Sequence, residues 1–82
     1  MPYIDKKRRE ELGRYGYPKN AGELNYRITQ VMLEYLKDKG ESYQAYNDIM
    51  GVLEGAKLEL YRRKIGIYED QKKEINGDVY TP

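Results

Sequence analysis

With no cysteine and no histidine, this 82-residue chain can be held neither by disulfide bonds nor by a Cys/His zinc site. A chain of this size buries only about 60% of the surface that its unfolded form exposes. Its Ala, Val, Ile, Leu and Met residues number 22 and its tyrosines 10. The core of a single copy is therefore small, and self-association is the simplest remedy. We expect one helical domain over residues 1–82 that forms a homo-oligomer.

The composition also argues against several classes of protein. No run of about 18 apolar residues and no charged-then-apolar leader occurs, so we expect neither a transmembrane nor a signal segment. Without His or Cys, no Ser-His or Cys-His catalytic pair can form, and the carboxylates show no diagnostic spacing. No glycine-rich phosphate loop or acidic metal loop is present. We predict a non-enzymatic protein with no metal and no cofactor. The net charge of +1 argues against disorder and against nucleic-acid binding.

Helix start and stop signals divide the chain into three helical segments. The first covers residues 5–13, with Asp5 near its start and Gly13 as its stop, and a loop over residues 14–20 follows. Only Ile4, Leu12 and the stem of Arg8 would face a partner. The cations of residues 6–9 form either a solvated helix face or, as the sharper alternative, a nucleic-acid contact.

The second helix is predicted over residues 20–39, where Asn20 and Glu23 have the spacing of a capping box and Gly40 supplies the stop. Its apolar stripe, spaced three and four residues apart, consists of Leu24, Ile28, Val31 and Tyr35. The opposite face is predicted to carry Arg27, Gln30, Glu34, Lys37 and Asp38.

The third helix is predicted over residues 42–73, capped by Ser42, with a bend at Gly66 and an end at Asn76-Gly77 before an extended tail over residues 76–82. Its stripe consists of Tyr46, Ile49, Leu53, Ala56 and Leu60. Ion pairs are predicted on its outer face between Glu54 and Lys57, Glu59 and Arg63, and Glu69 and Lys73. The fold class is therefore all-α: a short N-terminal helix and two longer antiparallel helices that pack into a helical homo-oligomer.

Gly51 and Gly55 lie one turn apart inside the third helix, where each costs about 0.5–1 kcal/mol relative to alanine. A glycine groove lets another helix or a flat ligand approach the backbone closely. We favour helix packing and predict an oligomer interface formed by Tyr46, Gly51, Gly55 and Leu60.

A basic and aromatic cluster lies late in the third helix and contains Lys57, Tyr61, Arg62, Arg63, Lys64 and Tyr68. Arginine forks bind phosphate and tyrosine rings stack on bases, so the cluster suits a nucleotide. The plainer alternative is a solvated face balanced by neighbouring carboxylates. Asn25, Thr29, Asn47 and Asp48 are poor helix formers inside helical patterns, and they are either exposed or hydrogen-bonded to a partner.

Three stretches resemble a family of small, uncharacterised bacteriophage and prophage proteins. These are Gly22–Thr29 (GELNYRIT), Asn47–Arg63 (NDIMGVLEGAKLELYRR), and YEDQK at residues 68–72 with NGDVY at residues 76–80; the chain also shares the Met-Pro-Tyr-Ile start. The resemblance implies a phage protein acting in the cytoplasm of the bacterial host. By analogy alone, size, expected oligomerisation and Tyr/Arg/Asn content are similar to those of the phage sponge proteins that sequester immune signals of Thoeris and CBASS systems.

The favoured hypothesis is a binder that sequesters a nucleotide signal, either a cyclic ADP-ribose type or a cyclic dinucleotide, between protomers. The predicted ligand-binding residues are Asn25, Tyr26, Asn47, Lys57, Tyr61, Arg62 and Arg63. The alternative is a protein-interaction module that blocks or recruits a host factor through its Tyr-rich helix. A second alternative is a nucleic-acid-binding accessory protein, against which the near-neutral charge argues.

Overall fold

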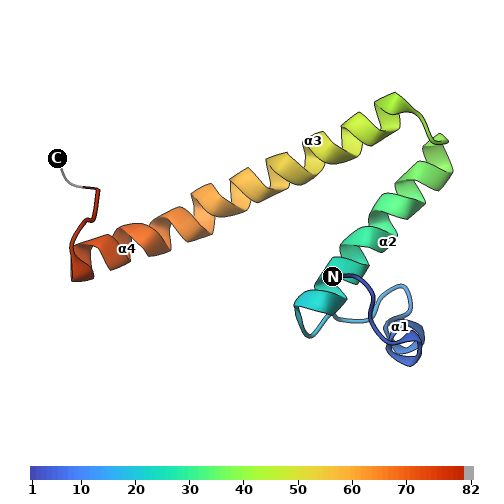
Figure 1. The fold of residues 1–82 in the computed structure, drawn as a ribbon, viewed down its shortest axis with the longest axis horizontal. Coiled ribbons are helices and arrows are strands. Elements are labelled where there is room, and N and C mark those ends of the chain that lie inside the picture. The colour runs from blue at the N-terminus through green and yellow to red at the C-terminus, as the bar shows by residue number, and fades with distance from the viewer. Residues whose placement is uncertain (81–82) are drawn as a thin grey trace. The chain divides into compact units, whose positions relative to one another are not determined.

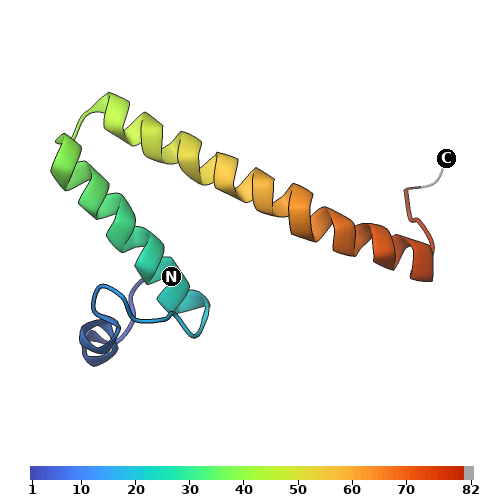
Figure 2. The ribbon, with the colours of Figure 1, turned by 180° about the vertical axis from the view of Figure 1, so that it is seen from behind.

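The computed structural model describes residues 1–80, and every regular element among them is a helix (Figure 1). The elements are α1 (Lys6–Leu12), α2 (Ala21–Lys39), α3 (Tyr43–Leu60), the π-helix η1 (Tyr61–Ile65) and α4 (Gly66–Asn76). Because α3, η1 and α4 follow one another without a break, they form one long helix (Figure 2). The all-α prediction, with one short and two longer helices, is confirmed.

The structure divides into two compact units, Met1–Tyr46 and the residues from Asn47 onward, and each is considered by itself. The antiparallel packing of the second and third helices, the single domain over residues 1–82 and the homo-oligomer therefore stay predictions. Of the predicted tail over residues 76–82, the last two residues lie outside the described part of the chain.

The predicted capping residues occupy the helix ends. Asp5 accepts a hydrogen bond from the Lys7 amide (2.7 Å), and Ser42 Oγ accepts one from the Ala45 amide (3.1 Å). The third helix continues past the predicted bound at residue 73 to Asn76, and the predicted stop at Asn76-Gly77 is confirmed, because Gly77 is its cap. Gly77 has a φ of 90°, which glycine adopts without steric cost.

Glu23 ties the start of α2 to α1. Its side chain accepts hydrogen bonds from Nε and Nη2 of Arg8, both at 2.9 Å, from the Lys19 amide at 2.9 Å and from the Asn20 amide group at 3.4 Å. Asn20 caps the Glu23 amide (2.9 Å) as predicted, but Glu23 bonds the Lys19 amide rather than the Asn20 backbone. Arg8, expected to contact a partner only through its stem, uses its charged end instead. This bidentate pair makes Glu23, at 7% exposure, the buried charge of the unit.

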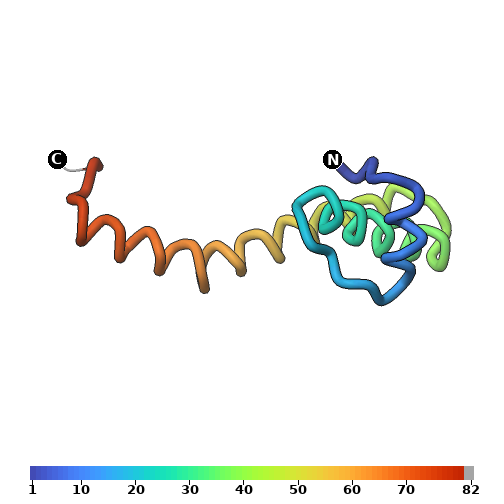
Figure 3. The backbone as a smooth tube through the Cα atoms, turned by 90° about the horizontal axis from the view of Figure 1, so that it is seen from below, coloured from blue at the N-terminus to red at the C-terminus, as the bar shows by residue number. Residues whose placement is uncertain are grey.

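Arg27 fixes the end of α1 and the loop after it. Its Nη1 donates to the carbonyls of Gly13 (3.0 Å) and Arg14 (2.9 Å), and its Nη2 donates to those of Leu12 (3.4 Å) and Gly16 (2.5 Å). The trace in Figure 3 shows the chain passing from α1 through this loop to α2. A cation suits the carbonyl end of a helix.

The predicted outward face of α2 is therefore wrong at two positions, Arg27 and Gln30. Gln30 Nε2 donates to the Gly13 carbonyl (3.4 Å), while its Oε1 accepts from Arg27 (2.6 Å). Helical spacing alone could not reveal this, because the carbonyls that both side chains contact come from α1 and its loop.

The apolar core of the first unit is small. Leu12 at 2% and Ala45 at 3% exposure are its buried apolar residues among those described. The N-terminal segment approaches the backbone of α2 closely, since a Cβ at Gly22 would lie 3.4 Å from the Met1 carbonyl oxygen and 3.5 Å from the Ile4 side chain. Hydrogen bonds from Arg8 and Arg27 thus supplement an apolar core that is small because the chain has few apolar residues.

Replacing one glycine by alanine in each unit should change the free energy of unfolding in opposite directions. A Cβ at Gly16 would lie 2.3 Å from the Leu12 carbonyl oxygen, whereas a Cβ at Gly55 meets nothing within 4 Å. We expect Gly16→Ala to lower the free energy of unfolding by about 1–3 kcal/mol. We expect Gly55→Ala to raise it by about 0.5–1 kcal/mol, because a helix interior favours alanine. Chemical denaturation followed by circular dichroism measures both; equal effects would contradict the close approach at Gly16.

The Arg8–Glu23 pair should make stability depend on acid pH. Hydrogen bonds from Arg8 and then Lys19 lower the pKa of Glu23 from its ordinary 4.5 to about 2. The folded chain favours the charged form of Glu23 more than the unfolded chain does. The stability that this charged carboxylate gives to the fold is therefore fully present above about pH 4.5 and is lost as the pH falls towards 2. In Glu23→Gln this part of the pH dependence should vanish, as shown by melting temperatures measured from neutral to acid pH. Glu10→Gln, on the exposed side of α1, should keep it.

Candidate functional site

The long helix widens at residues 61–65, within the cluster that the sequence predicts to bind a ligand. In η1 the backbone bonds span five residues, and the Gly66 amide donates to the Tyr61 carbonyl. The bend predicted at Gly66 is thus replaced by a π-turn that begins five residues earlier. Single π-turns within α-helices are rare and occur frequently at functional sites.

Glu59 orients two neighbouring arginines. Nη2 of Arg62 donates to both Glu59 carboxylate oxygens (3.0 and 2.9 Å), and Nε of Arg63 donates to Oε1 of the same carboxylate. These bonds lower the pKa of Glu59, that from Arg63 most. Both arginine side chains are exposed, at 72% and 70%. Each arginine uses one guanidinium nitrogen to bond Glu59. Because a guanidinium has three nitrogens, both arginines keep further N–H groups that can bind an anion.

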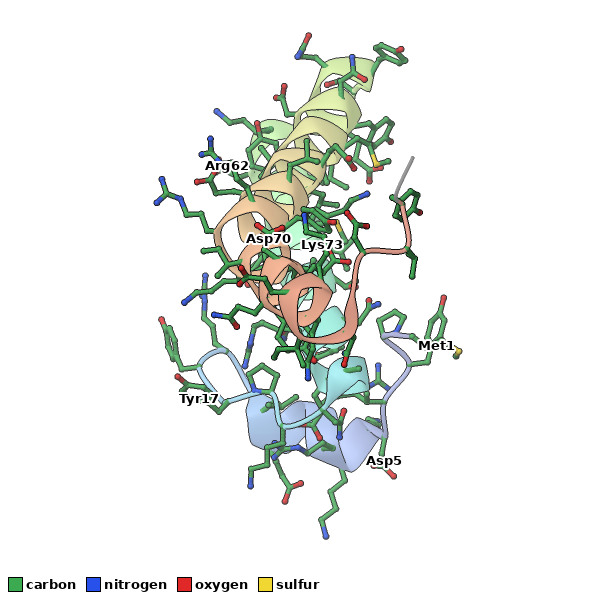
Figure 4. The ribbon with its side chains drawn as sticks, turned by 90° about the vertical axis from the view of Figure 1, so that its left-hand side faces the viewer. Met1, Asp5, Tyr17, Arg62, Asp70 and Lys73 are labelled. Atoms are coloured by element: carbon green, nitrogen blue, oxygen red, sulfur yellow. The ribbon has the colours of Figure 1, made fainter. Side chains whose placement is uncertain are left out.

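A shallow hollow of about 550 Å³ is lined by Arg62, Arg63, Lys64 and Ile67. We call Arg62, Arg63 and Lys64 the basic face. Three cations stand there against the one carboxylate of Glu59, so the surface is net positive. In Figure 4, Arg62 lies on the left of the long helix, whereas the chain after α4 lies on its right.

Tyr61 belongs to a different hollow, on the side of the C-terminal segment. Its hydroxyl donates to Glu69 Oε1 (2.5 Å), a bond that raises the pKa of Tyr61. The hollow, of about 530 Å³, is also lined by Lys72, Lys73 and Tyr80. Glu69, Asp70 and Asp78 line it as well. Its carboxylates outnumber its cations, so it is less suited to a phosphate than the basic face.

The structure therefore divides the predicted cluster. Tyr61 lines the hollow on the side of the C-terminal segment, whereas Arg62 and Arg63 line the other hollow. Lys57 lies one turn earlier and pairs with Glu54 at 3.4 Å, as predicted. The predicted Glu59–Arg63 pair is also confirmed.

The third predicted ion pair, between Glu69 and Lys73, is wrong. Lys73 pairs instead with Asp70 at 3.8 Å, and Glu69 accepts from Tyr61. The second partner of Glu59 was missed in the sequence, although Arg62 stands three residues after it, a spacing at which helix side chains meet.

The remaining predicted ligand residues come from both units. Asn25 is exposed, and its carbonyl accepts from Thr29 Oγ1 (2.8 Å), a local bond within α2. Tyr26 is half-buried, and its hydroxyl accepts from Gln30 Nε2 (3.3 Å). Asn47 is exposed in the second unit. A joint site of these residues with the basic face stays a prediction.

The predicted interface residues are accessible. Tyr46 and Leu60 are exposed, and Tyr46 donates its hydroxyl to Glu41 (2.7 Å). Gly51 and Gly55 each stand two residues from Leu53, which is about half a turn around the helix. The glycine groove and the apolar stripe thus lie on different sides, and one flat partner cannot cover both. Their use in an oligomer stays a prediction.

Within residues 1–80, no group of three or more acidic residues is placed to hold a metal ion, and no helix is long and apolar enough to cross a membrane.

Comparison with known proteins gives one match. Residues 1–79 match the family model of a domain of unknown function, DUF6899. No curated protein and no solved structure matches the chain.

Proposed function

We propose that this chain, which belongs to the DUF6899 family, is a non-enzymatic binding protein that captures a nucleotide through the phosphates. The observation that carries the proposal is the basic face beside the π-turn, where one carboxylate, Glu59, orients two exposed arginines. Sequestration requires affinity and no reaction, so no residue is assigned a catalytic role.

Phosphate recognition follows from the geometry of the basic face. A guanidinium binds phosphate oxygens through paired, charge-assisted N–H bonds, and two adjacent forks can hold one phosphate or bridge two. Glu59 fixes the arginine side chains before the ligand arrives, which lowers the conformational entropy that binding costs. Its negative charge acts in the opposite direction, because it competes with the phosphate for the same donors.

Base recognition requires an aromatic ring that the basic face lacks. Tyr61 of the same chain lines the other hollow. A second copy would therefore have to supply the ring that stacks on the base while the basic face binds the phosphate. This agrees with a site between protomers, in which Tyr26 stacks on the base and Asn25 and Asn47 read its polar edges. The resemblance to phage proteins makes an immune signal of the host cytoplasm the suggested ligand, of cyclic ADP-ribose or cyclic dinucleotide type.

A second candidate function is a protein-interaction module, the alternative weighed from the sequence. It is favoured by the exposure of large apolar and aromatic side chains along the long helix, among them Val52, Leu58, Ile67 and Tyr68. Such a surface is typical of a binding face.

The first experiment is a thermal-shift panel of cyclic dinucleotides and ADP-ribose derivatives, with inorganic phosphate as the reference anion. A ligand present at a hundred times its dissociation constant adds about 2.7 kcal/mol of apparent stability. We expect one nucleotide class to shift the melting temperature and phosphate to shift it less. No shift with any nucleotide would contradict the proposal and favour the second candidate.

Variants of the basic face should change nucleotide affinity in opposite directions. Arg62→Gln with Arg63→Gln should weaken binding of the nucleotide found in the panel by about a hundredfold, with helix content unchanged because Arg and Gln have similar helix propensities. Glu59→Gln should strengthen it, since a competing carboxylate is removed. Calorimetric titration and circular dichroism measure both.

The matched control for charge is Lys6→Gln with Lys7→Gln, which removes two exposed cations from α1 and should leave affinity unchanged. If the control weakens binding as much as the arginine variant does, the interaction is with net charge rather than with a site. Unchanged affinity in the folded arginine variant would remove the basic face from the site.

A further inference from the structure

The long helix lacks a covering partner within its own unit. α3, η1 and α4 have 18, 5 and 11 residues, and no residue from Asn47 to Tyr80 is buried. Helices in water obtain most of their stability from packing of an apolar face rather than from intrinsic propensity. A helix of this length with exposed Leu60, Ile65 and Ile75 therefore requires a surface to pack against.

Two apolar stripes follow the long helix, one on each side of η1. The first consists of Ile49, Leu53, Ala56 and Leu60, spaced four, three and four residues apart. The second consists of Ile65, Tyr68 and Ile75, with the cation of Lys72 interrupting it, and these four positions are spaced three, four and three apart. Each spacing keeps its residues on one side of an α-helix. The two stripes meet between Leu60 and Ile65. The spacing there is five residues, which departs from the three- and four-residue spacing that keeps side chains on one side of an α-helix.

The π-turn lies at this irregular step. In a regular α-helix, five residues rotate a side chain about 140° past a full turn, so Ile65 would point away from Leu60. η1 spans residues 61–65, and its five-residue hydrogen bonds let one turn take up an extra residue. Ile65 thereby returns towards the side of Leu60, and the two stripes join in one seam from Ile49 to Ile75.

We propose that this seam packs antiparallel against the same seam of a second copy of the chain. The length of the helix favours a second copy over the chain's own α2. α2 has 19 residues, about 28 Å, against about 51 Å for the long helix. Only residues 40–42 separate α2 from α3, so α2 folded fully back would end near the start of η1 and leave Ile65–Ile75 uncovered. A second copy supplies a helix of matching length.

Charge and size favour the antiparallel direction. In a parallel pair in register, Lys72 would stand opposite Lys72 of the other copy inside an apolar seam. In an antiparallel pair centred on η1, Tyr68 stands opposite Ala56, a large side chain against a small one, and Ile75 opposite Ile49. Lys72 then stands opposite Leu53 instead of a second Lys72, and its ammonium lies 5.7 Å from the ring centre of Tyr68 in its own chain.

The first test compares two isoleucines of the full chain. Ile65 is 40% exposed on the seam, and Ile67, 55% exposed, points about 200° away from it. We expect sedimentation equilibrium to show a wild-type dimer, Ile65→Lys to weaken its association by about a hundredfold, and Ile67→Lys to leave it within about threefold. A monomer at all concentrations, which would leave the seam to α2 or to a foreign protein, overturns the proposal. So does a dimer that only Ile67→Lys dissociates.

The second test addresses the π-turn. Deleting Lys64 shortens the step from Leu60 to Ile65 to four residues, which a regular α-helix keeps on one side, so the dimer should persist. Inserting one alanine after Lys64 lengthens the step to six, more than one π-turn absorbs, and should weaken association about tenfold or more. Circular dichroism verifies that both variants are helical. Equal association of both helical variants would show that the seam does not run through η1.

The direction is tested with single cysteines, since the chain has none of its own. Mixing Ala56→Cys and Tyr68→Cys under oxidation should give mainly the mixed disulfide. Disulfides between identical variants only would overturn the antiparallel arrangement. None of these measurements needs a nucleotide, so they test the pairing whether or not the proposed ligand binds.

Discussion

The constraint on which the rest of this protein depends is a long helix whose apolar stripe has no cover within its own unit. Thirty-four consecutive helical residues give the chain more amphipathic surface than its short first unit could bury. The stripe has to be covered, and a helix of matching length is the simplest cover. A second copy of the chain and a partner protein, the two proposed covers, would both use this surface.

The π-turn links packing to chemistry. In the proposed pairing its extra residue lets the stripe continue past an irregular step, and three residues of the same turn carry the basic face. Glu59 holds Arg62 and Arg63 in place whether or not an anion is present, so the basic face is already ordered in the single chain.

The first unit is stabilised by a different means. Two arginines, Arg8 and Arg27, replace much of what a core would contribute, one by a bidentate pair to Glu23 and the other by capping carbonyls around Gly13 and Gly16. The loop also lies close to α1, where the Gly16 amide donates to the Leu12 carbonyl, so Gly16 has no room for a side chain. The cost is sensitivity to acid, since protonation of Glu23 removes the partner of Arg8.

The sequence by itself determined the helices, because their start and stop signals are local: Asp5, Asn20 and Ser42 cap, and glycines end, each helix within a few residues. It also showed that basic and aromatic residues are concentrated between residues 57 and 68. Only the tertiary structure decided where Arg8 and Arg27 bond, since their partners lie 9 to 15 residues away in sequence. It also decided that Tyr61 and Arg63 line different hollows. The direction of a side chain depends on the exact turn of the helix, and the π-turn that changes this direction has no local sequence signal.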